Sequence, residues 1–292
     1  MIRSIAISIC TLISMGLFSQ LPNTQLYLIE YDFGSKTSEV IEIRYLTSFN
    51  SLGYNNQPYL SSESEVYFTS SHEAFGLTDV YRMDLNNEVL TRITQTEESE
   101  YSPQLNVDET ISVIRQELDD SQPIPQTLWK YPADLSSFGK NALPVRSDIG
   151  YYCWLPNNEV ALFIVGERNS LIQMNSITKE EKFISYNIGR CLRYDEQGGL
   201  LYVQKLGSTW MIKRRVINEG ITQTITPTLD DSEDFEILSN GNLLAGKGSK
   251  LFVFDMTLKN GWKEIADLSS AGISEITRIA AKDNKVVLVS RQ

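Results

Sequence analysis

Short stretches in which apolar and polar residues alternate recur along the chain, and polar turns separate them. This period of two is typical of half-buried β-strands, and no stretch shows a long helical period. The apolar residue that opens the second strand of each unit marks a repeat: Val66, Ile111, Val160, Leu200, Leu243 and Val286. The spacings are 45, 49, 40, 43 and 43 residues, as expected for four-stranded propeller blades. The pattern predicts an all-β, six-bladed β-propeller of four-stranded antiparallel blades.

The two ends of the chain each supply half of a unit. The four strands expected there are Gln25–Tyr31, Val40–Leu46, Ile276–Ala280 and Lys285–Ser290. We expect them to form one blade, in which the N-terminal strands close the ring and hide two sheet edges. This closure predicts that two N-terminal residues, Leu28 and Ile43, pack against Val287 and Val289.

The second unit is longer than the others because it contains a Pro-rich excursion, Gln122–Gln126. Its fourth strand is predicted at Ala142–Arg146. Splitting this unit in two would give a seventh, degenerate blade, and this alternative stays open at the level of sequence.

The segment from Gln57 to Arg115 carries the most regular motifs of the chain. They are Gln57-Pro58-Tyr59-Leu60-Ser61, Val66-Tyr67-Phe68-Thr69-Ser70, Asp79-Val80-Tyr81-Arg82-Met83-Asp84-Leu85, Leu90-Thr91-Arg92-Ile93-Thr94 and Glu100-Tyr101-Ser102-Pro103 running to Asn106-Val107-Asp108. This segment resembles the TolB-like (WD40-like) β-propeller repeat family. The family's Ser-Pro-Asp-Gly turn survives only in part, and the extra domain that precedes the propeller in TolB has no counterpart. The resemblance implies an exported six-bladed propeller that serves as a binding platform.

The N-terminal stretch has the features of a secretory signal peptide. Arg3 precedes an apolar run from Ile5 to Phe18, and Ser19 is a small residue at a suitable cleavage position. The run is shorter than the roughly 20 residues of a membrane-spanning helix. We therefore predict cleavage after residue 19 and a single propeller domain over residues 20–292, periplasmic or secreted; a retained anchor is the alternative.

The charge balance limits the partners. The chain has 26 Lys and Arg residues against 37 Asp and Glu residues, a formal net charge of -11. Nucleic acid and anionic membranes are poor partners for such a protein. We predict a monomer that binds a protein or peptide with a basic surface and does not insert into a membrane.

Acidic residues gather on the loops that propeller topology brings to one side of the ring. They are Glu97, Glu98, Glu100, Asp119, Asp120, Asp230, Asp231, Glu233 and Asp234. Converging charge speeds the capture of an oppositely charged partner, so these residues predict an acidic partner-binding face. Carboxylates are also calcium ligands, and the run from Asp230 to Asp234 keeps calcium open, although it lacks the spacing of a calcium loop. No other metal or cofactor is predicted.

Groups suited to nucleophilic catalysis are scarce. His72 is the only histidine, no G-x-S-x-G motif occurs, and one His with separated Cys residues does not make a zinc site. Cys153 and Cys191 remain after signal cleavage, and we predict that both are free and buried. The sequence therefore predicts a protein that is not an enzyme.

Aromatic residues on the innermost strand of the third unit could line the axial channel. They belong to the run Tyr151-Tyr152-Cys153-Trp154, in which alternate side chains either face the channel or pack between blades. Three functional hypotheses follow. The first is a non-catalytic binding scaffold of the cell envelope; the others are a calcium-dependent propeller hydrolase of the lactonase kind, and a glycan or small-molecule binder that uses the channel aromatics.

Overall fold

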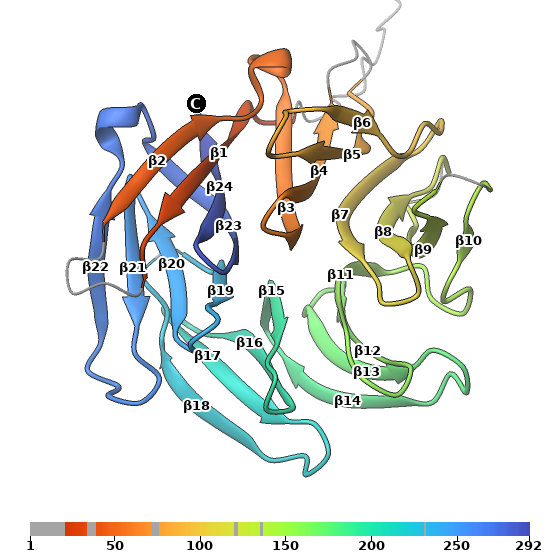
Figure 1. The fold of residues 1–292 in the computed structure, drawn as a ribbon. Helices are drawn as coiled ribbons and strands as arrows, with labels where there is room; N and C mark the ends of the chain where they lie inside the picture. Colours follow the sequence, from red (N-terminus) through yellow and green to blue (C-terminus); the bar gives the residue numbers. More distant parts are fainter. Residues whose placement is uncertain (1–20, 34–38, 72–75, 120–121, 135–136, 231) are drawn as a thin grey trace, which may run out of the picture.

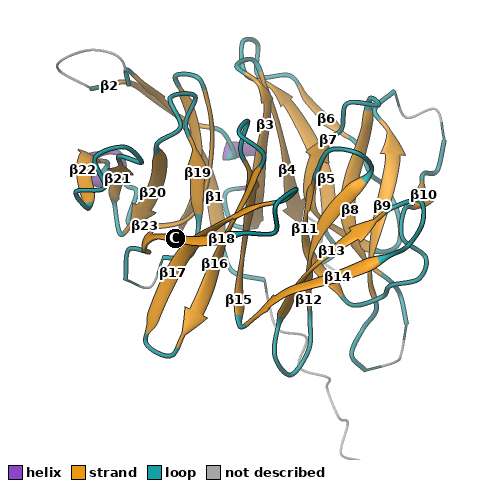
Figure 2. Ribbon diagram, turned by 90° about the horizontal axis from the view of Figure 1, so that it is seen from below, coloured by secondary structure: helices purple, strands orange, loops and turns teal. Residues whose placement is uncertain are grey.

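The chain forms a ring of twisted antiparallel sheets around a central axis (Figure 1). The computed structural model describes residues 21–33, 39–71, 76–119, 122–134, 137–230 and 232–292. Seen from the edge, the sheets span the thickness of the ring, and only two short 3-10 turns interrupt the β-structure of the described residues (Figure 2). The predicted signal peptide and His72 lie outside the described residues.

Four of the sheets contain four strands each, in the order in which the strands occur along the chain. The first is β7 (Ser99–Leu105), β8 (Thr110–Gln116), β9 (Gln126–Pro132) and β10 (Lys140–Asn141). The second is β11 (Ile149–Trp154), β12 (Glu159–Ile164), β13 (Ser170–Asn175) and β14 (Glu181–Tyr186). The third is β15 (Ile188–Tyr194), β16 (Gly199–Leu206), β17 (Thr209–Val216) and β18 (Thr222–Pro227). The fourth is β19 (Phe235–Ile237), β20 (Leu243–Lys247), β21 (Lys250–Phe254) and β22 (Trp262–Asp267).

A larger, eight-stranded sheet holds both ends of the described chain. One half contains β23 (Glu275–Lys282), β24 (Lys285–Arg291), β1 (Thr24–Tyr31) and β2 (Val40–Tyr45). The other half contains β3 (Tyr54–Ser62), β4 (Glu65–Ser71), β5 (Asp79–Asp84) and β6 (Leu90–Arg92). A single parallel pair, Thr24 with Tyr54, connects the two halves.

The prediction that N-terminal strands pair with C-terminal strands is confirmed, because β1 pairs antiparallel with β24 along its length. Leu28 lies opposite Val287 and shares a buried cluster with Val287 and Val289. The prediction for Ile43 is wrong. Ile43 lies opposite Ile29 on the other face of the sheet, where it packs in a cluster with Val286 and Leu288, since side chains alternate between the faces along a strand.

The fourth strand of the second unit lies upstream of its predicted position, at Lys140–Asn141 instead of Ala142–Arg146. The Asn141 side chain accepts a hydrogen bond from the backbone N–H of Leu143, which turns the chain inward and buries the Leu143 side chain. The N–H of Arg146 then bonds to the carbonyl of Leu143. A side-chain hydrogen bond of this kind competes with ladder pairing, so the strand ends early.

The innermost strands, β3, β7, β11, β15, β19 and β23, lie around the axis (Figure 1). Five of them show a register shift against the next strand. Such bulges re-aim side chains and often occur next to functional sites. Gln57 and Ser102, each followed by a proline, have positive φ angles of 54° and 55°, and the Ser102 N–H bonds to the Gln57 side chain at 3.0 Å. The inner wall of the ring therefore departs from regular strand geometry where a ligand could approach it.

Candidate binding site in the axial channel

A cavity of about 450 Å³ occupies the centre of the ring. Its lining comes from all six innermost strands and the residues beside them, and it includes aliphatic, aromatic and charged residues. This volume lies within the roughly 300–1,000 Å³ of typical ligand pockets. The cavity is therefore the candidate binding site.

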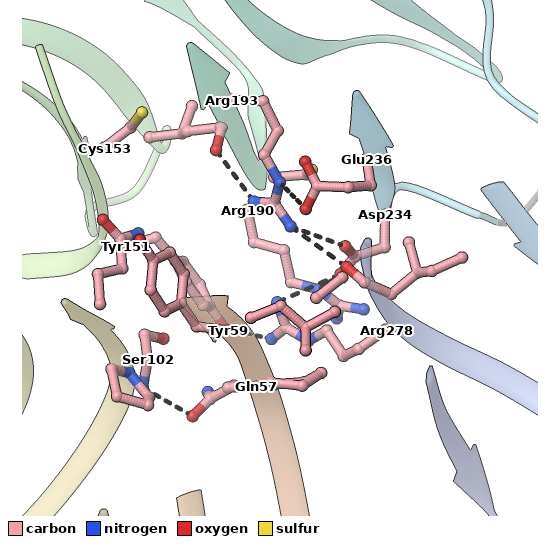
Figure 3. A pocket seen from close by; sticks show the side chains of 18 of the residues that line it. Gln57, Tyr59, Ser102, Tyr151, Cys153, Arg190, Arg193, Asp234, Glu236 and Arg278 are labelled. Carbon is pink, nitrogen blue, oxygen red and sulfur yellow. Dashed lines mark hydrogen bonds and ion pairs between the residues drawn. The ribbon is translucent and has the colours of Figure 1, made fainter. Parts of the chain in front are cut away.

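Three arginines from two innermost strands point into this cavity (Figure 3). Arg190 and Arg193 belong to β15, and Arg278 belongs to β23. Arg190 falls within the register shift of β15, and Arg278 adjoins the one in β23. The irregular backbone of these strands thus presents charged side chains toward the axis, whereas the regular strands behind them are apolar.

The Asp234 carboxylate lies among all three guanidinium groups. Its oxygens are 3.4 Å from Nη1 of Arg278, 3.7 Å from Nε of Arg190 and 3.9 Å from Nη2 of Arg193. These distances exceed the roughly 2.7–2.9 Å of a charge-assisted hydrogen bond. Asp234 therefore neutralises the arginines only loosely.

Arg193 has a closer partner of its own. Its Nε donates to Glu236 at 2.8 Å, and its Nη1 and Nη2 donate to the carbonyls of Leu192 and Ile279. Burial raises the pKa of the Glu236 carboxyl, and the Arg193 charge offsets only part of that increase. Burial lowers the pKa of Arg193, but the combined attraction of Glu236, Cys191 and Asp234 outweighs burial, so the pKa rises. Arg193 and Glu236 form a closed pair.

The other two arginines are less engaged. Nη2 of Arg190 donates to the Thr277 carbonyl at 2.9 Å, and Nη1 lies 3.4 Å from Glu233, but its buried Nε has no hydrogen-bond acceptor. Arg278 donates to the Tyr151 hydroxyl at 3.0 Å, and its guanidinium lies 5.2 Å from the centre of the Tyr151 ring. Both keep donor capacity on the cavity side.

The three channel aromatics of the sequence analysis have different surroundings. Tyr151 faces Arg278 across the cavity (Figure 3). Tyr152 is buried, and its hydroxyl lies within 2.8 Å of the carbonyls of Ser102 and Ser112. Trp154 donates its ring N–H to the Ser112 hydroxyl, and the Lys130 ammonium covers its ring at 4.5 Å. Only Tyr151 of these three therefore offers its polar end to the channel.

The predicted acidic face divides into exposed and buried residues. Glu97, Asp119 and Asp230 are exposed. Asp120 and Asp231 lie outside the described residues. The expectation of solvent exposure is wrong for the remaining residues, which are buried or nearly so and face other side chains: Glu98, Glu100, Glu233 and Asp234. A role of the exposed residues in partner binding stays a prediction.

Glu98 lies just before β7, the innermost strand of the first four-stranded sheet, and Glu100 lies on that strand. Glu98 pairs with Arg115, which also lies 3.2 Å from Glu117. Glu100 is fully buried; the Thr96 hydroxyl donates to its Oε1 at 2.5 Å, while its Oε2 has no partner. Burial raises the pKa of Glu100 to about 7. Glu100 is therefore a buried carboxyl without a close cation and not a solvated charge.

The carboxylates of the run from 230 to 234 mostly face cations. Lys205 donates to Glu233 at 2.8 Å, and Asp230 lies 3.6 Å from the Lys247 ammonium. The described residues include no group of three or more His, Cys, Asp or Glu side chains arranged to hold a metal ion. The calcium site stays a prediction.

Cys153 and Cys191 are both free and buried, as predicted. They border the cavity from neighbouring innermost strands. Burial raises the pKa of each thiol to about 12. Because the thiolate is the reactive form, both cysteines remain protonated at neutral pH.

Comparisons with solved structures support the fold. A TolB candidate from Agrobacterium tumefaciens matches with a TM-score of 0.65 at 9% identity, over 93% of this chain and 99% of that one. The nidogen/laminin complex matches with a TM-score of 0.63 at 12% identity, over 91% and 98%. An oligogalacturonate lyase in complex with manganese matches with a TM-score of 0.53 at 12% identity, over 94% and 98%.

No protein-family model and no curated protein sequence matches the chain. Likeness at this level of identity shows the fold alone, and the same fold carries unrelated functions. The chain therefore has the β-propeller fold that the TolB candidate also has.

The arginine cluster escaped the sequence analysis. Arg190 and Arg193 stand in the stretch Ile188-Gly189-Arg190-Cys191-Leu192-Arg193, and Arg278 stands in Ile276-Thr277-Arg278-Ile279. Charged residues within apolar innermost strands were the available signal, because burying a charge is costly unless it is paired or functional.

Proposed function

We propose that this protein is a non-catalytic binding propeller that holds its ligand in the axial channel. The observation that carries the proposal is the cavity itself, with Arg190 and Arg278 under-engaged on its wall. Its potential nucleophiles and bases are held in unreactive states: the thiols have raised pKa values, and the carboxylates of Asp234 and Glu236 face arginines. Such a wall suits recognition better than bond chemistry.

Backbone strain next to the cavity supports the same proposal. Gln57 and Ser102 both line the cavity and both have positive φ angles. For residues other than glycine, such conformations cost about 1–3 kcal/mol each and gather at functional sites. The strained pair and the arginines line the same cavity (Figure 3), so a ligand held there would lie close to both.

We further propose that the ring has six blades, counting the eight-stranded sheet as two. The single parallel pair between β1 and β3, compared with the seven antiparallel pairs between β1 and β24, supports this count. A buried cluster joins the two halves, with Leu26 and Val287 on one side and Leu60 and Phe68 on the other. Deleting residues 25–46 should therefore abolish folding; a truncated protein that stays cooperatively folded and monomeric contradicts the closure.

The proposal includes export. Residues 1–19 have the composition of a signal peptide, and the described residues include no helix that is long and apolar enough to cross a membrane. We expect the native protein to begin at residue 20 and to act in the periplasm or outside the cell. The intact mass of protein isolated from its natural cells tests this directly.

Site-specific photo-crosslinking tests binding in the channel. The photoreactive amino acid p-benzoylphenylalanine is placed at Tyr151 inside the cavity or, as a matched control, at Phe183 on the exposed outer strand β14. Irradiation of the producing cells should give adducts from position 151 and none from position 183. The opposite pattern, or no adduct from 151 in a folded variant, contradicts channel binding.

A further inference from the structure

The balance of charge in the channel is opposite to that of the whole protein. The chain has a net charge of -11, yet the cavity lining combines Arg190, Arg193, Arg278 and Lys282 with only two carboxylates, Asp234 and Glu236. The neighbouring pair of Glu233 and Lys205 adds no net charge. A protein that is acidic overall therefore concentrates positive charge at its axis, and such a focused field attracts anions.

The donors that remain open belong to Arg190 and Arg278. Arg193 is closed by Glu236 at 2.8 Å, whereas Asp234 is the shared and distant partner of the other two. An arginine fork matches a carboxylate in a bidentate contact. A ligand carboxylate beside Asp234 would engage Arg190 and Arg278, for which Asp234 is a partner only at 3.7 and 3.4 Å.

The rest of the wall fits a peptide. Three aliphatic residues of the innermost strands, Leu60, Leu192 and Ile279, also line the cavity, although their side chains are buried in hydrophobic clusters. The innermost strands β7, β11, β15, β19 and β23 are also the ends of their sheets, so their outer backbone groups face the axis. Side chains already bind some of these groups: Arg190 and Arg193 donate to the Thr277 and Ile279 carbonyls. An extended peptide can bind further groups of this kind through its main chain.

We propose that the channel recognises a peptide through a carboxylate. Arg278 and Arg190 bind this carboxylate, and Tyr151 lies beside it. This inference rests on the proposed function, since it names the ligand class of the same cavity. The carboxylate can belong to a peptide C-terminus or to an acidic side chain. A doubly charged phosphate suits the site less well, because Asp234 and Glu236 stand next to the arginines and repel the second charge.

The test observes the arginines directly. The full mature protein is labelled with ¹⁵N-arginine, and the Nε–H signals are followed during titration with three probes. These are N-acetyl-Ala-Leu-Ala with a free C-terminus, the same peptide as its C-terminal amide, and N-acetyl-Ala-Glu-Ala amide. We expect saturable shifts of the Arg278 and Arg190 signals with at least one carboxylate peptide and none with the amide. Which acid binds identifies the source of the carboxylate.

Variants sharpen the assignment. Arg278→Gln should weaken the binding of the acid peptide at least tenfold, as expected for loss of a charged hydrogen-bond partner. Arg278→Lys keeps the charge but loses the forked guanidinium, so its affinity for the acid peptide should lie between those of Arg278→Gln and the wild type. Arg168→Gln, at an exposed arginine outside the cavity lining, should bind like the wild type. Because the wild-type comparison of acid with amide needs no variant, a folding defect of Arg278→Gln leaves the test intact.

Three results overturn the proposal: equal shifts from acid and amide, arginine signals that do not move, or inorganic phosphate that displaces the peptide at lower concentration. Adducts from position 151 together with unmoved arginine signals would mean that the channel binds a ligand of another class. In that case the ligand assignment fails while the proposed function stands. If position 151 also gives no adducts, both the ligand assignment and the proposed function fail.

Discussion

Two regions of the ring bury carboxylates in opposite surroundings. Between the sheets that begin with β3 and β7, Glu100 meets the hydroxyls of Thr96 and Tyr131, and the nearby Arg115 pairs with Glu98. Beside the axial channel, Glu233 meets Lys205 at 2.8 Å and Arg190 at 3.4 Å. Burial raises the pKa of Glu100 to about 7. Burial also acts on Glu233, but its hydrogen bond to Lys205 and the Arg190 charge hold its pKa below the ordinary value.

The difference shows that burial alone does not decide the charge state of a carboxyl. Desolvation disfavours the anion in both places, and a cation at contact distance reverses the outcome. The channel side of the ring is therefore built from ion pairs, whereas the Glu100 site is built from neutral donors. The two regions should respond to pH and to charge removal in opposite directions.

Removal of the Asp234 charge should have the largest effect. Asp234→Asn keeps the side-chain shape but leaves three guanidinium groups facing one another. Breaking a buried ion pair costs about 3–5 kcal/mol, so we expect a loss of this size in urea unfolding at pH 7. The double variant Asp234→Asn/Arg278→Gln should recover part of it, because one of the uncompensated charges is gone. Additive losses would show that Asp234 and Arg278 do not interact.

Glu100→Gln should act in the opposite direction. The folded carboxyl holds its proton more tightly than the unfolded one, with a pKa of about 7 against 4.5. Its contribution to stability is therefore complete below pH 4.5 and is lost as the pH rises to about 7, a change of about 3 kcal/mol. The glutamine variant avoids this loss, and it should exceed the wild type by up to about 3 kcal/mol at pH 8 and match it at pH 4.

Unfolding curves from pH 4 to pH 8 measure this difference. Glu97 is the matched control. It is exposed and lies two residues before β7, so Glu97→Gln should follow the wild-type curve at every pH. Parallel curves for Glu100→Gln and the wild type would mean that folding does not shift the pKa of Glu100.

Glu233→Gln should show a smaller effect of the reverse sign. The folded pKa of Glu233 is lowered, so its contribution is present above the unfolded pKa and is lost as the pH falls through the folded one. Hydrogen bonds to charged groups contribute about 1.5–3 kcal/mol, and we expect a loss near the lower end at pH 7. The gap to the wild type should narrow in acid. A constant gap in thermal unfolding at several pH values would contradict the pairing with Lys205 and Arg190.

The smallest effect belongs to Asp230, whose side chain is 93% exposed. Its contact with Lys247 at 3.6 Å is screened by water and salt. Asp230→Asn should change the free energy of unfolding by less than about 0.5 kcal/mol. Urea unfolding at low and high salt measures it, and a larger, salt-sensitive loss would place Asp230 in the same network as Asp234.

The sequence by itself determined the repeating strands and the pairing of the two ends of the chain. Both depend on local patterns: the period-two alternation around Val66 and Val286, and the half units at the termini, which are completed when β1 pairs with β24. The free state of Cys153 and Cys191 was also predicted from the sequence, on the expectation that innermost strands of adjacent blades stand too far apart for a disulfide, and both are free.

Only the tertiary structure decided the chemistry of the channel. Arg190 and Arg278 are 88 positions apart in the sequence, and they meet at Asp234 because the closed ring brings their innermost strands to one axis. The same closure turns Glu233 toward Lys205 and buries Glu100 without a close cation. A run of acidic residues in the sequence does not reveal this, because the charge state and exposure of a carboxyl depend on partners that other strands supply.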